Sequence, residues 1–250
     1  MTLMDRLSIL ACPFIFAHMI PTAIIVAGGS GKRMKISTPK QFLLLDGVPI
    51  LVHTVRRFLN WHQELQLALV LPEAHFPTWK EMAIQHLNPV DQERILLCKG
   101  GSSRTASVWA GISALVEKEG TENALVAIHD GVRPFISDQI MKSAFEMAAE
   151  KGACVVCVPV KASLRKKEGH GSVAVDRSAY FEVQTPQVFH LKKIEEAFLQ
   201  RKHDSFTDDA SLYQDMGGEV SICEGSYDNI KITTPEDLAV GLDILRRLEG

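Results

Sequence analysis

The clearest chemical signal in the sequence is a glycine-rich segment that directly follows a predicted strand. The segment consists of Ala27, Gly28, Gly29, Ser30 and Gly31. Glycines let the backbone turn sharply and bring its N–H groups close to an anion, because no side chain stands in the way. The segment therefore predicts a phosphate-binding loop, with a solvated surface turn as the alternative.

Positive charge is concentrated just after this loop. Positions 32 to 40 contain no acidic residue and four basic ones, Lys32, Arg33, Lys35 and Lys40. The whole chain carries 27 Lys and Arg against 30 Asp and Glu, a formal net charge of −3, so this cluster is a local feature. The overall balance gives no reason to expect binding to nucleic acid or to an anionic membrane, and any anion site must be local.

The loop matches neither of two common phosphate-binding motifs. The pattern GxxxxGK[ST] fails because the glycine spacing differs and Arg33 follows Lys32. The pattern GxGxxG fails because Met34 stands where the third glycine belongs. The loop is therefore neither a P-loop nor a dinucleotide-binding fingerprint.

A second chemical signal is Asp130, which follows the apolar run Leu125 to Ile128. In parallel α/β sheets ligands bind beyond the carboxyl ends of the strands, so this carboxylate is placed to hold Mg²⁺ against phosphate oxygens. A turn or helix-capping aspartate is the alternative. The neighbouring His129 is expected to pack or hydrogen-bond locally rather than to transfer protons.

Strand-like and helix-like segments alternate along the chain and must position these residues. Apolar runs predict strands at 23–27, 67–71, 95–98, 125–128 and 154–159, and helical spacing occurs at 50–58, 74–86, 105–118 and 138–150. Further helices are expected near 191–201, 208–216 and 235–248, with short strands near Val220 and Ile230. This order predicts a single Rossmann-like α/β fold, a mostly parallel sheet flanked by helices.

The segment from about 160 to 189 interrupts this alternation. It combines a basic cluster, glycines and alternating apolar residues, which predicts a protruding β-ribbon arm with a functional or interfacial role. We expect an N-terminal extension over 1–18 and one α/β domain over 19–250 that includes the arm. The apolar run Leu7 to Ala17 imitates a signal-peptide core, but Asp5 and Pro13 favour a short extension without a catalytic role.

Composition excludes several classes of protein. With 46% hydrophobic and 23% charged residues, the chain is neither disordered nor a coiled coil. Its five cysteines are expected to be reduced thiols of a cytoplasmic protein, and a strand would direct Cys154 and Cys157 to opposite faces, against a redox or zinc site. No apolar stretch reaches the roughly 18 residues of a membrane span, so a soluble protein is expected.

Several separated motifs occur in an order typical of one enzyme family. They are Ala27-Gly28-Gly29-Ser30-Gly31-Lys32-Arg33-Met34, Pro39-Lys40-Gln41, His129-Asp130-Gly131-Val132-Arg133-Pro134, Thr185-Pro186-Gln187, Thr207-Asp208-Asp209 and Asn229-Ile230-Lys231-Ile232-Thr233. With these motifs the chain resembles the 2-C-methyl-D-erythritol 4-phosphate cytidylyltransferases from about Pro21 to its end. It is also similar to the ribitol-5-phosphate cytidylyltransferases, so two acceptors stay open.

The resemblance implies a reaction of CTP with a polyol phosphate that yields a CDP-polyol and pyrophosphate. It assigns three catalytic cations, Arg33 and Lys40 at the triphosphate and Lys231 near the α-phosphate. It further implies Mg²⁺ as cofactor, held by Asp130 with Asp228 as the partner carboxylate. The attacking phosphate is already ionised, so no general base is required.

The resemblance also assigns the contacts of the two substrates. Ala27, Gly28, Gly29, Ser30 and Gly31 are expected at the nucleotide, with Gly101 and Ser107 around the base and ribose; Ser107 as a plain helix-surface serine is the alternative. Ser102 departs from the acidic residue common at its position. The acceptor-binding residues are Arg133, Ser163, Arg177, Thr185 and Thr207.

Two further points concern the acceptor site: one step of the sequence departs from the family, and the family's subunit arrangement contributes to the site. Ala162-Ser163 replaces an Asp-Thr step of the family, which keeps the hydroxyl and loses the carboxylate. In the family the arm is exchanged between two subunits, so the resemblance implies a homodimer in which each partner completes the other's acceptor site. Transfer to methylerythritol phosphate in isoprenoid-precursor synthesis is the leading expectation, and the alternatives are transfer to ribitol phosphate and a non-catalytic nucleotide-binding regulatory module.

Overall fold

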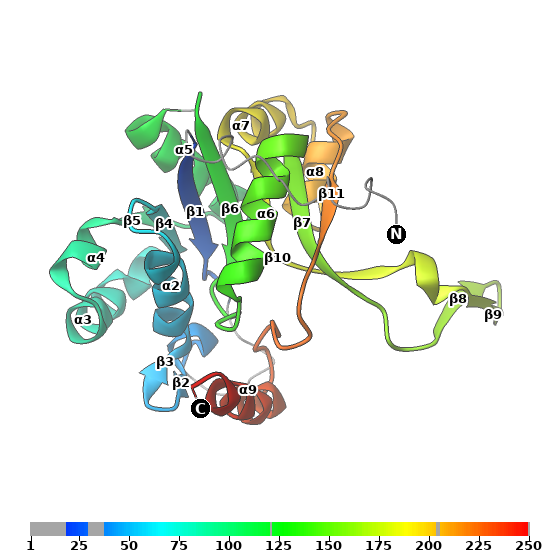
Figure 1. Cartoon of the computed structure of the whole chain (residues 1–250), viewed down its shortest axis with the longest axis horizontal. Coiled ribbons are helices and arrows are strands. Elements are labelled where there is room, and N and C mark those ends of the chain that lie inside the picture. Colours follow the sequence, from blue (N-terminus) through cyan, green and yellow to red (C-terminus); the bar gives the residue numbers. More distant parts are fainter. Residues whose placement is uncertain (1–18, 30–37, 121, 204–205, 250) are drawn as a thin grey trace, which may run out of the picture.

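Apolar runs build one central sheet. The computed structural model describes residues 19–29, 38–120, 122–203 and 206–249, and within them seven strands pair in the order β11-β7-β10-β6-β1-β4-β5 (Figure 1). The strands are β1 (Ile20–Val26), β4 (Gln66–Leu71), β5 (Ile95–Lys99), β6 (Ala124–Asp130), β7 (Ala153–Pro159), β10 (Phe181–His190) and β11 (Ser221–Glu224). Neighbouring strands are parallel except that β10 runs antiparallel to both β6 and β7. The predicted mostly parallel α/β sheet is confirmed.

The connections between the strands form helices and two short hairpin strands. The helices are α2 (Ile50–Trp61), α3 (Phe76–His86), α4 (Pro89–Glu93), α5 (Arg104–Glu119), α6 (Asp138–Lys151), α7 (Leu191–Gln200), α8 (Asp209–Asp215) and α9 (Pro235–Glu249). The short strands are β2 (Leu44–Leu45) and β3 (Val48–Pro49), preceded by the 3-10 turn η3 (Lys40–Phe42). Ser103 and Ser137 accept hydrogen bonds from the backbone at the starts of α5 and α6 and so act as N-caps.

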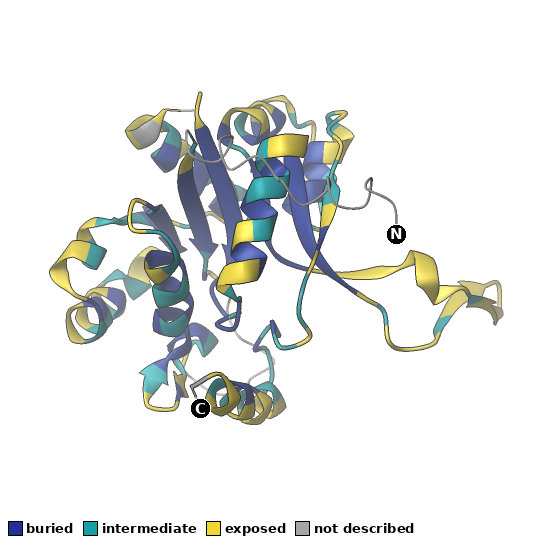
Figure 2. Ribbon diagram, viewed as in Figure 1, coloured by how far each residue is buried: buried dark blue, intermediate teal, exposed yellow. Residues whose placement is uncertain are grey.

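Successive side chains of each strand point to opposite faces of the sheet, and helices cover both faces. On β1, Ala23 and Ile25 face a core shared with α2, α3 and α6, whereas Ile24 faces a core shared with α5, α7 and α8. The same alternation places Cys154 and Cys157 of β7 in opposite cores, as predicted. Because both faces are covered, β1 and β6 are almost wholly buried (Figure 2).

One expected strand is absent. The short strand predicted near Val220 forms as β11, but the one predicted near Ile230 does not form, and residues 229–233 run as a loop. The backbone there makes a single link to the opposite loop, from Ile232 N–H to Val132 O at 2.9 Å, instead of a strand ladder. That irregular backbone carries Lys231 across the edge of the sheet.

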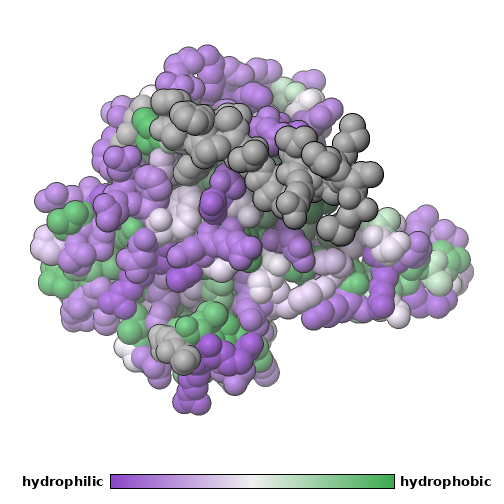
Figure 3. Space-filling view, in the orientation of Figure 1, coloured by the Kyte–Doolittle hydropathy of each residue, from purple (hydrophilic) through white to green (hydrophobic). Residues whose placement is uncertain are grey.

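The arm is a separate hairpin that projects from the sheet. It consists of β8 (Leu164–Glu168) and β9 (Gly171–Val175), and the 3-10 turn η5 (Arg177–Ala179) leads from it into β10 (Figure 1). Tyr180, Phe181 and Val183 are exposed, and hydrophobic groups are visible on the arm in Figure 3. Residues 181–189, which the sequence placed in the arm segment, belong to β10 of the central sheet, where this strand pairs with β7 and, from Gln187 on, also with β6.

Candidate functional site

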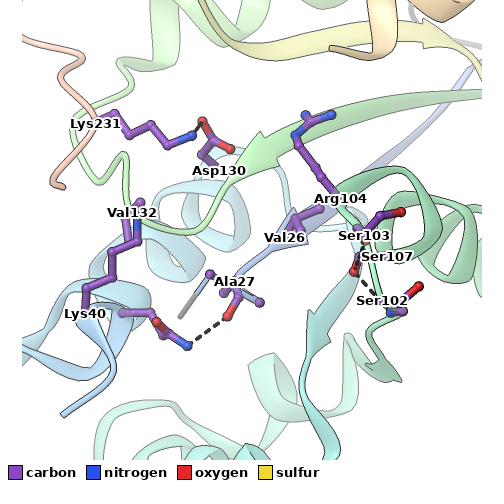
Figure 4. Close-up of a pocket in the computed structure, with 14 residues that line it drawn as sticks. Val26, Ala27, Lys40, Ser102, Ser103, Arg104, Ser107, Asp130, Val132 and Lys231 are labelled. Atoms are coloured by element: carbon purple, nitrogen blue, oxygen red, sulfur yellow. Dashed lines mark hydrogen bonds and ion pairs between the residues drawn. The ribbon is translucent and has the colours of Figure 1, made fainter. Parts of the chain in front are cut away.

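A cavity of about 270 Å³ opens at the carboxyl ends of β1 and β6 (Figure 4). Its lining comes from five separate stretches of chain: Val26 to Gly29, Lys40 and Gln41, Gly101 to Arg104 with Ser107, Asp130 and Val132, and Lys231. Parallel strands direct their carboxyl ends to one edge, so the topology brings these stretches together where α/β proteins bind ligands. Of the predicted site residues, the cavity unites Ala27, Gly28, Gly29, Lys40, Gly101, Ser107, Asp130 and Lys231.

The glycine loop is held by a side chain to which the sequence reasoning gave no role. Gln41 is almost fully buried, and its Nε2 donates to the Ala27 carbonyl oxygen at 2.9 Å. A Cβ at Gly28 would meet no atom within 4 Å, and one at Gly29 would lie 3.5 Å from Lys40 Cε. The loop therefore presents open backbone toward the ammonium-bearing side chain of Lys40. Ser30, Gly31 and Arg33 lie outside the described residues.

The second loop of the cavity is closely packed against the start of α5. A Cβ at Gly101 would lie 2.4 Å from Ala106 Cβ, so only glycine fits there. The Gly101 N–H donates to Ser107 Oγ at 3.1 Å, and that hydroxyl donates to the Ser103 carbonyl oxygen at 2.8 Å. Ser107 is thus a buried residue that shapes the loop, not a helix-surface serine.

Asp130 lies at the centre of a cationic cluster. Its Oδ2 is 2.9 Å from Lys231 Nζ and 3.3 Å from Arg133 Nε, and the side chains of Asp130 and Arg133 are each only 12% exposed. Burial on its own would raise the pKa of Asp130, but the charges of Lys231 and Arg133 outweigh it and hold the pKa at about 2. The carboxylate is ionised at neutral pH, with more positive than negative charge around it.

His129, beside Asp130, is a packing residue. It is fully buried, its ring lies 4.9 Å from that of Phe58, and its Nε2 lies 3.0 Å from the Arg133 carbonyl oxygen, to which it donates. Burial lowers the pKa of His129 to about 4, so the ring is neutral at pH 7. This geometry agrees with local packing and hydrogen bonding.

An ion pair between Arg104, which lines the cavity, and Asp209 was not predicted from the sequence. Arg104 Nη1 and Nη2 lie 2.9 and 2.6 Å from the two carboxylate oxygens of Asp209, which is buried at the start of α8. Burial raises the pKa of Asp209, and pairing with Arg104 only partly offsets this effect. Asp209 falls inside a quoted motif and Arg104 lies between the predicted Gly101 and Ser107, but the two are 105 positions apart and no sequence pattern indicated that they meet.

The residues predicted to bind the acceptor are distributed over three places. Thr185 and Arg133 adjoin Asp130: the Asp130 N–H donates to Thr185 Oγ1 at 3.1 Å. Thr207 lies before α8, with its hydroxyl 3.2 Å from that of Ser211. Ser163 and Arg177 are exposed on the arm, outside the cavity lining, and Arg177 donates to the Lys161 carbonyl oxygen.

The second predicted metal carboxylate is engaged elsewhere. Asp228 Oδ1 is 3.0 Å from Arg247 Nη2 of α9, and Asp228 is not part of the cavity lining. In the described part of the chain, no three His, Cys, Asp or Glu side chains form a group that could hold a metal ion. A metal at this cavity would therefore need Asp130 together with oxygens of a bound ligand, which is how Mg²⁺ is commonly held in nucleotide sites.

None of the helices in the described part of the chain has the length and apolar character needed to cross a membrane.

Comparison with known proteins agrees with this geometry. The family model for 2-C-methyl-D-erythritol 4-phosphate cytidylyltransferase matches residues 21–247. A protein of that name from Bacteroides thetaiotaomicron is 41% identical over 227 residues, covering 91% of this chain and 100% of the relative. One from Bacillus velezensis is 38% identical over 231 residues, covering 91% and 96%.

Solved structures show the same fold. The crystal structure of the 2-C-methyl-D-erythritol 4-phosphate cytidylyltransferase from Thermus thermophilus aligns with a TM-score of 0.70 and 30% identity, covering 90% of this chain and 98% of that one. The 4-diphosphocytidyl-2C-methyl-D-erythritol synthase from Anaerococcus prevotii aligns with a TM-score of 0.78 and 25% identity, covering 93% and 99%. The chain is therefore a nucleotidyltransferase that belongs to the 2-C-methyl-D-erythritol 4-phosphate cytidylyltransferase family.

Proposed function

We propose that this protein transfers the cytidylyl group of CTP to 2-C-methyl-D-erythritol 4-phosphate, giving CDP-methylerythritol and pyrophosphate. The observation that carries the proposal is the convergence of an open glycine backbone, Lys40, Asp130 and Lys231 on one cavity. The relatives of this name from Bacteroides thetaiotaomicron and Bacillus velezensis are matched over 100% and 96% of their own length. Ribitol phosphate and a non-catalytic role are not favoured by these relatives.

The chemistry requires two anions to approach each other. An oxygen of the acceptor phosphate attacks the α-phosphorus of CTP, the new P–O bond forms, and the bond to the β-phosphate breaks in line to release pyrophosphate. Positioned cations stabilise the charge on the transferring group more than they stabilise the separated substrates. We assign this role to Lys231, with Lys40 and Arg33 at the triphosphate; the acceptor phosphate is ionised and needs no base.

Mg²⁺ is part of the proposal. Asp130 would hold it, because this carboxylate is ionised, lines the cavity and has a second oxygen besides the one that contacts Lys231 and Arg133. When bound, the ion would neutralise triphosphate oxygens and supply electrostatic stabilisation. Lys231 and Arg133 both contact Oδ2 and hold the carboxylate in place. Asp228, the second carboxylate, pairs with Arg247 and lies outside the cavity lining, so it would join only after moving toward the cavity.

A homodimer completes the proposed acceptor site. Ser163 and Arg177 lie on the projecting arm, so they would reach an acceptor only in the cavity of a second subunit. The exposed apolar side chains Tyr180, Phe181 and Val183 at the base of the arm would be covered by such a partner. Thr185, Arg133 and Thr207 would supply the acceptor contacts from the same chain. Both substrates are small polyanions. We expect the enzyme to act in the cytoplasm.

Pyrophosphate release tests the proposed reaction directly. The protein is incubated with CTP, Mg²⁺ and either 2-C-methyl-D-erythritol 4-phosphate or ribitol 5-phosphate, with ATP, GTP and UTP as alternative donors. We expect the highest kcat/KM with CTP and methylerythritol phosphate. Faster turnover of ribitol phosphate would overturn the acceptor, and binding of CTP without turnover of any acceptor would favour the regulatory module.

A further inference from the structure

Asn229 precedes Lys231 by two positions and is completely buried. Its side-chain amide donates two hydrogen bonds, to Gln184 Oε1 at 3.2 Å and to the Thr185 carbonyl oxygen at 2.9 Å. Both acceptors lie on β10 where this strand passes from the exposed arm into the buried sheet. The amide therefore ties the loop that carries Lys231 to the sheet.

Backbone carbonyl groups determine the orientation of both amides. Gln184 Nε2 donates to the Ser226 carbonyl oxygen at 2.8 Å, which turns Gln184 Oε1 toward Asn229. The Thr185 carbonyl can only accept. A flipped Asn229 amide would set its oxygen against these two acceptors. Asn229 Oδ1 is buried without a hydrogen-bond partner among the described residues, so this side chain is used for its two donors.

The same residues fasten Asp130. The hydroxyl of Thr185 accepts from the Asp130 N–H, while the carbonyl of Thr185 accepts from Asn229. Arg133 makes a parallel link, because its Nη1 donates to the Asn229 carbonyl oxygen at 2.8 Å and its Nε contacts Asp130 Oδ2 at 3.3 Å. Two independent connections thus hold the Asn229 segment and Asp130 at a set separation.

Lys231 depends on this support. Its side chain is 38% exposed and ends 2.9 Å from Asp130 Oδ2. A long lysine side chain has many rotamers, so the position of its ammonium group is only as well defined as the backbone that carries it. That backbone is fixed by Asn229 on one side and by the Ile232 N–H bond to Val132 on the other.

We infer that Asn229 is a positioning residue for Lys231: its amide clamps the Lys231 loop to Gln184 and Thr185 of β10 and thereby sets the place of the ammonium group relative to Asp130. The inference rests on the proposed role of Lys231 in turnover. Asn229 touches neither substrate; it acts through Lys231.

Two substitutions remove the clamp in different ways. Asn229→Ala deletes the amide, and Asn229→Asp keeps its shape but replaces the donors with an acceptor. We expect both to lower kcat by about 10- to 100-fold, since a misplacement of about 1 Å can cost that much. The KM for CTP should change by less than about threefold, because the lost interaction is one of the transition state.

A double-mutant cycle separates positioning from general damage. The residual activity of Lys231→Ala should fall by less than about threefold when Asn229→Ala is added, because a residue that acts through Lys231 has nothing left to position. Thr22→Val is the matched control: this hydroxyl is equally buried and donates to the Leu125 carbonyl oxygen at 2.9 Å near the start of β1. It should lower the melting temperature without lowering kcat.

A second variant covers the case in which Asn229→Ala does not fold. Gln184→Met removes the acceptor on the other side of the clamp. It should lower kcat by less than Asn229→Ala does, and its effect should not add to that of Lys231→Ala. A normal kcat in Lys231→Ala would overturn the role of Lys231 and this inference with it. The inference alone would be overturned if Lys231→Ala were slow while Asn229→Ala had a normal kcat. If Asn229→Ala does not fold, a normal kcat in Gln184→Met would have the same meaning. Full additivity in the double variant would also overturn it.

Discussion

The cationic cluster of the cavity and the hairpin of the arm hold their charged side chains differently. Asp130 and Arg133 are nearly buried, and each is tied to several partners. Arg177 is exposed on the arm, where it donates to the Lys161 carbonyl oxygen in the connection between β7 and β8. Electrostatic preorganisation requires charged groups that are fixed in place and shielded from water. In the cavity, a single chain provides such groups. If Arg177 binds substrate, it must gain its fixed surroundings from a second subunit.

We expect the largest loss of activity when divalent metal is removed. Dialysis against a chelator should abolish pyrophosphate release, because the triphosphate would face the acceptor phosphate without its main counterion, and adding Mg²⁺ should restore the rate. Melting temperature with and without chelator serves as the control and should not change. Unchanged turnover in chelator would rule out the metal role of Asp130 and leave the protein's cations alone to neutralise the substrates.

Removal of the Lys231 ammonium should have the next largest effect. We expect Lys231→Ala to lower kcat by about 10²- to 10³-fold, by analogy with the loss of one preorganised donor, while calorimetry shows nearly unchanged CTP binding. Lys192→Ala is the matched control, since this exposed lysine pairs with Glu122 on the surface. A near-normal kcat for Lys231→Ala would remove this residue from the transition state and weaken the contrast with the arm.

Mixed dimers test whether the arm serves a second subunit. Lys40→Ala and Arg177→Ala are each expected to be inactive, one in the cavity and one on the arm. If arms are exchanged, half of a random mixture is heterodimer with one intact site of two, so activity should recover to about a quarter of the wild-type value. Native mass spectrometry confirms subunit exchange. Exchange without recovery would place both residues in the same site of one chain.

The smallest effect is expected at the two cysteines of β7, the strand that leads from the sheet toward the arm. Cys157→Ala should leave kcat unchanged and lower the free energy of unfolding by about 1 kcal/mol, because it deletes one buried sulfur from the core. Urea unfolding and the pyrophosphate assay measure the two quantities. Cys154→Ala should behave alike, and a specific loss of activity in either would restore a chemical role for the pair.

Local patterns predicted the parts of the fold that depend on neighbours in sequence. Successive side chains of a strand point to opposite faces, so Ala23 and Ile25 lie in one core and Ile24 in the other. The same alternation separates Cys154 from Cys157. Ala27, Gly28, Gly29 and Asp130 line the cavity because each follows closely on an apolar strand. The strand expected near Ile230 was wrong, since a short apolar run cannot show whether a pairing partner is within reach.

The amino-acid sequence by itself determined the class of fold, the edge of the sheet at which the cavity opens and, through its motif order, the family. The tertiary structure alone decided which side chains meet there: Arg104 with Asp209, and Asn229 with Gln184 and Thr185. Hydrogen bonds and ion pairs of this kind join residues more than forty positions apart. Their geometry depends on how the strands and loops pack, and no local periodicity encodes it.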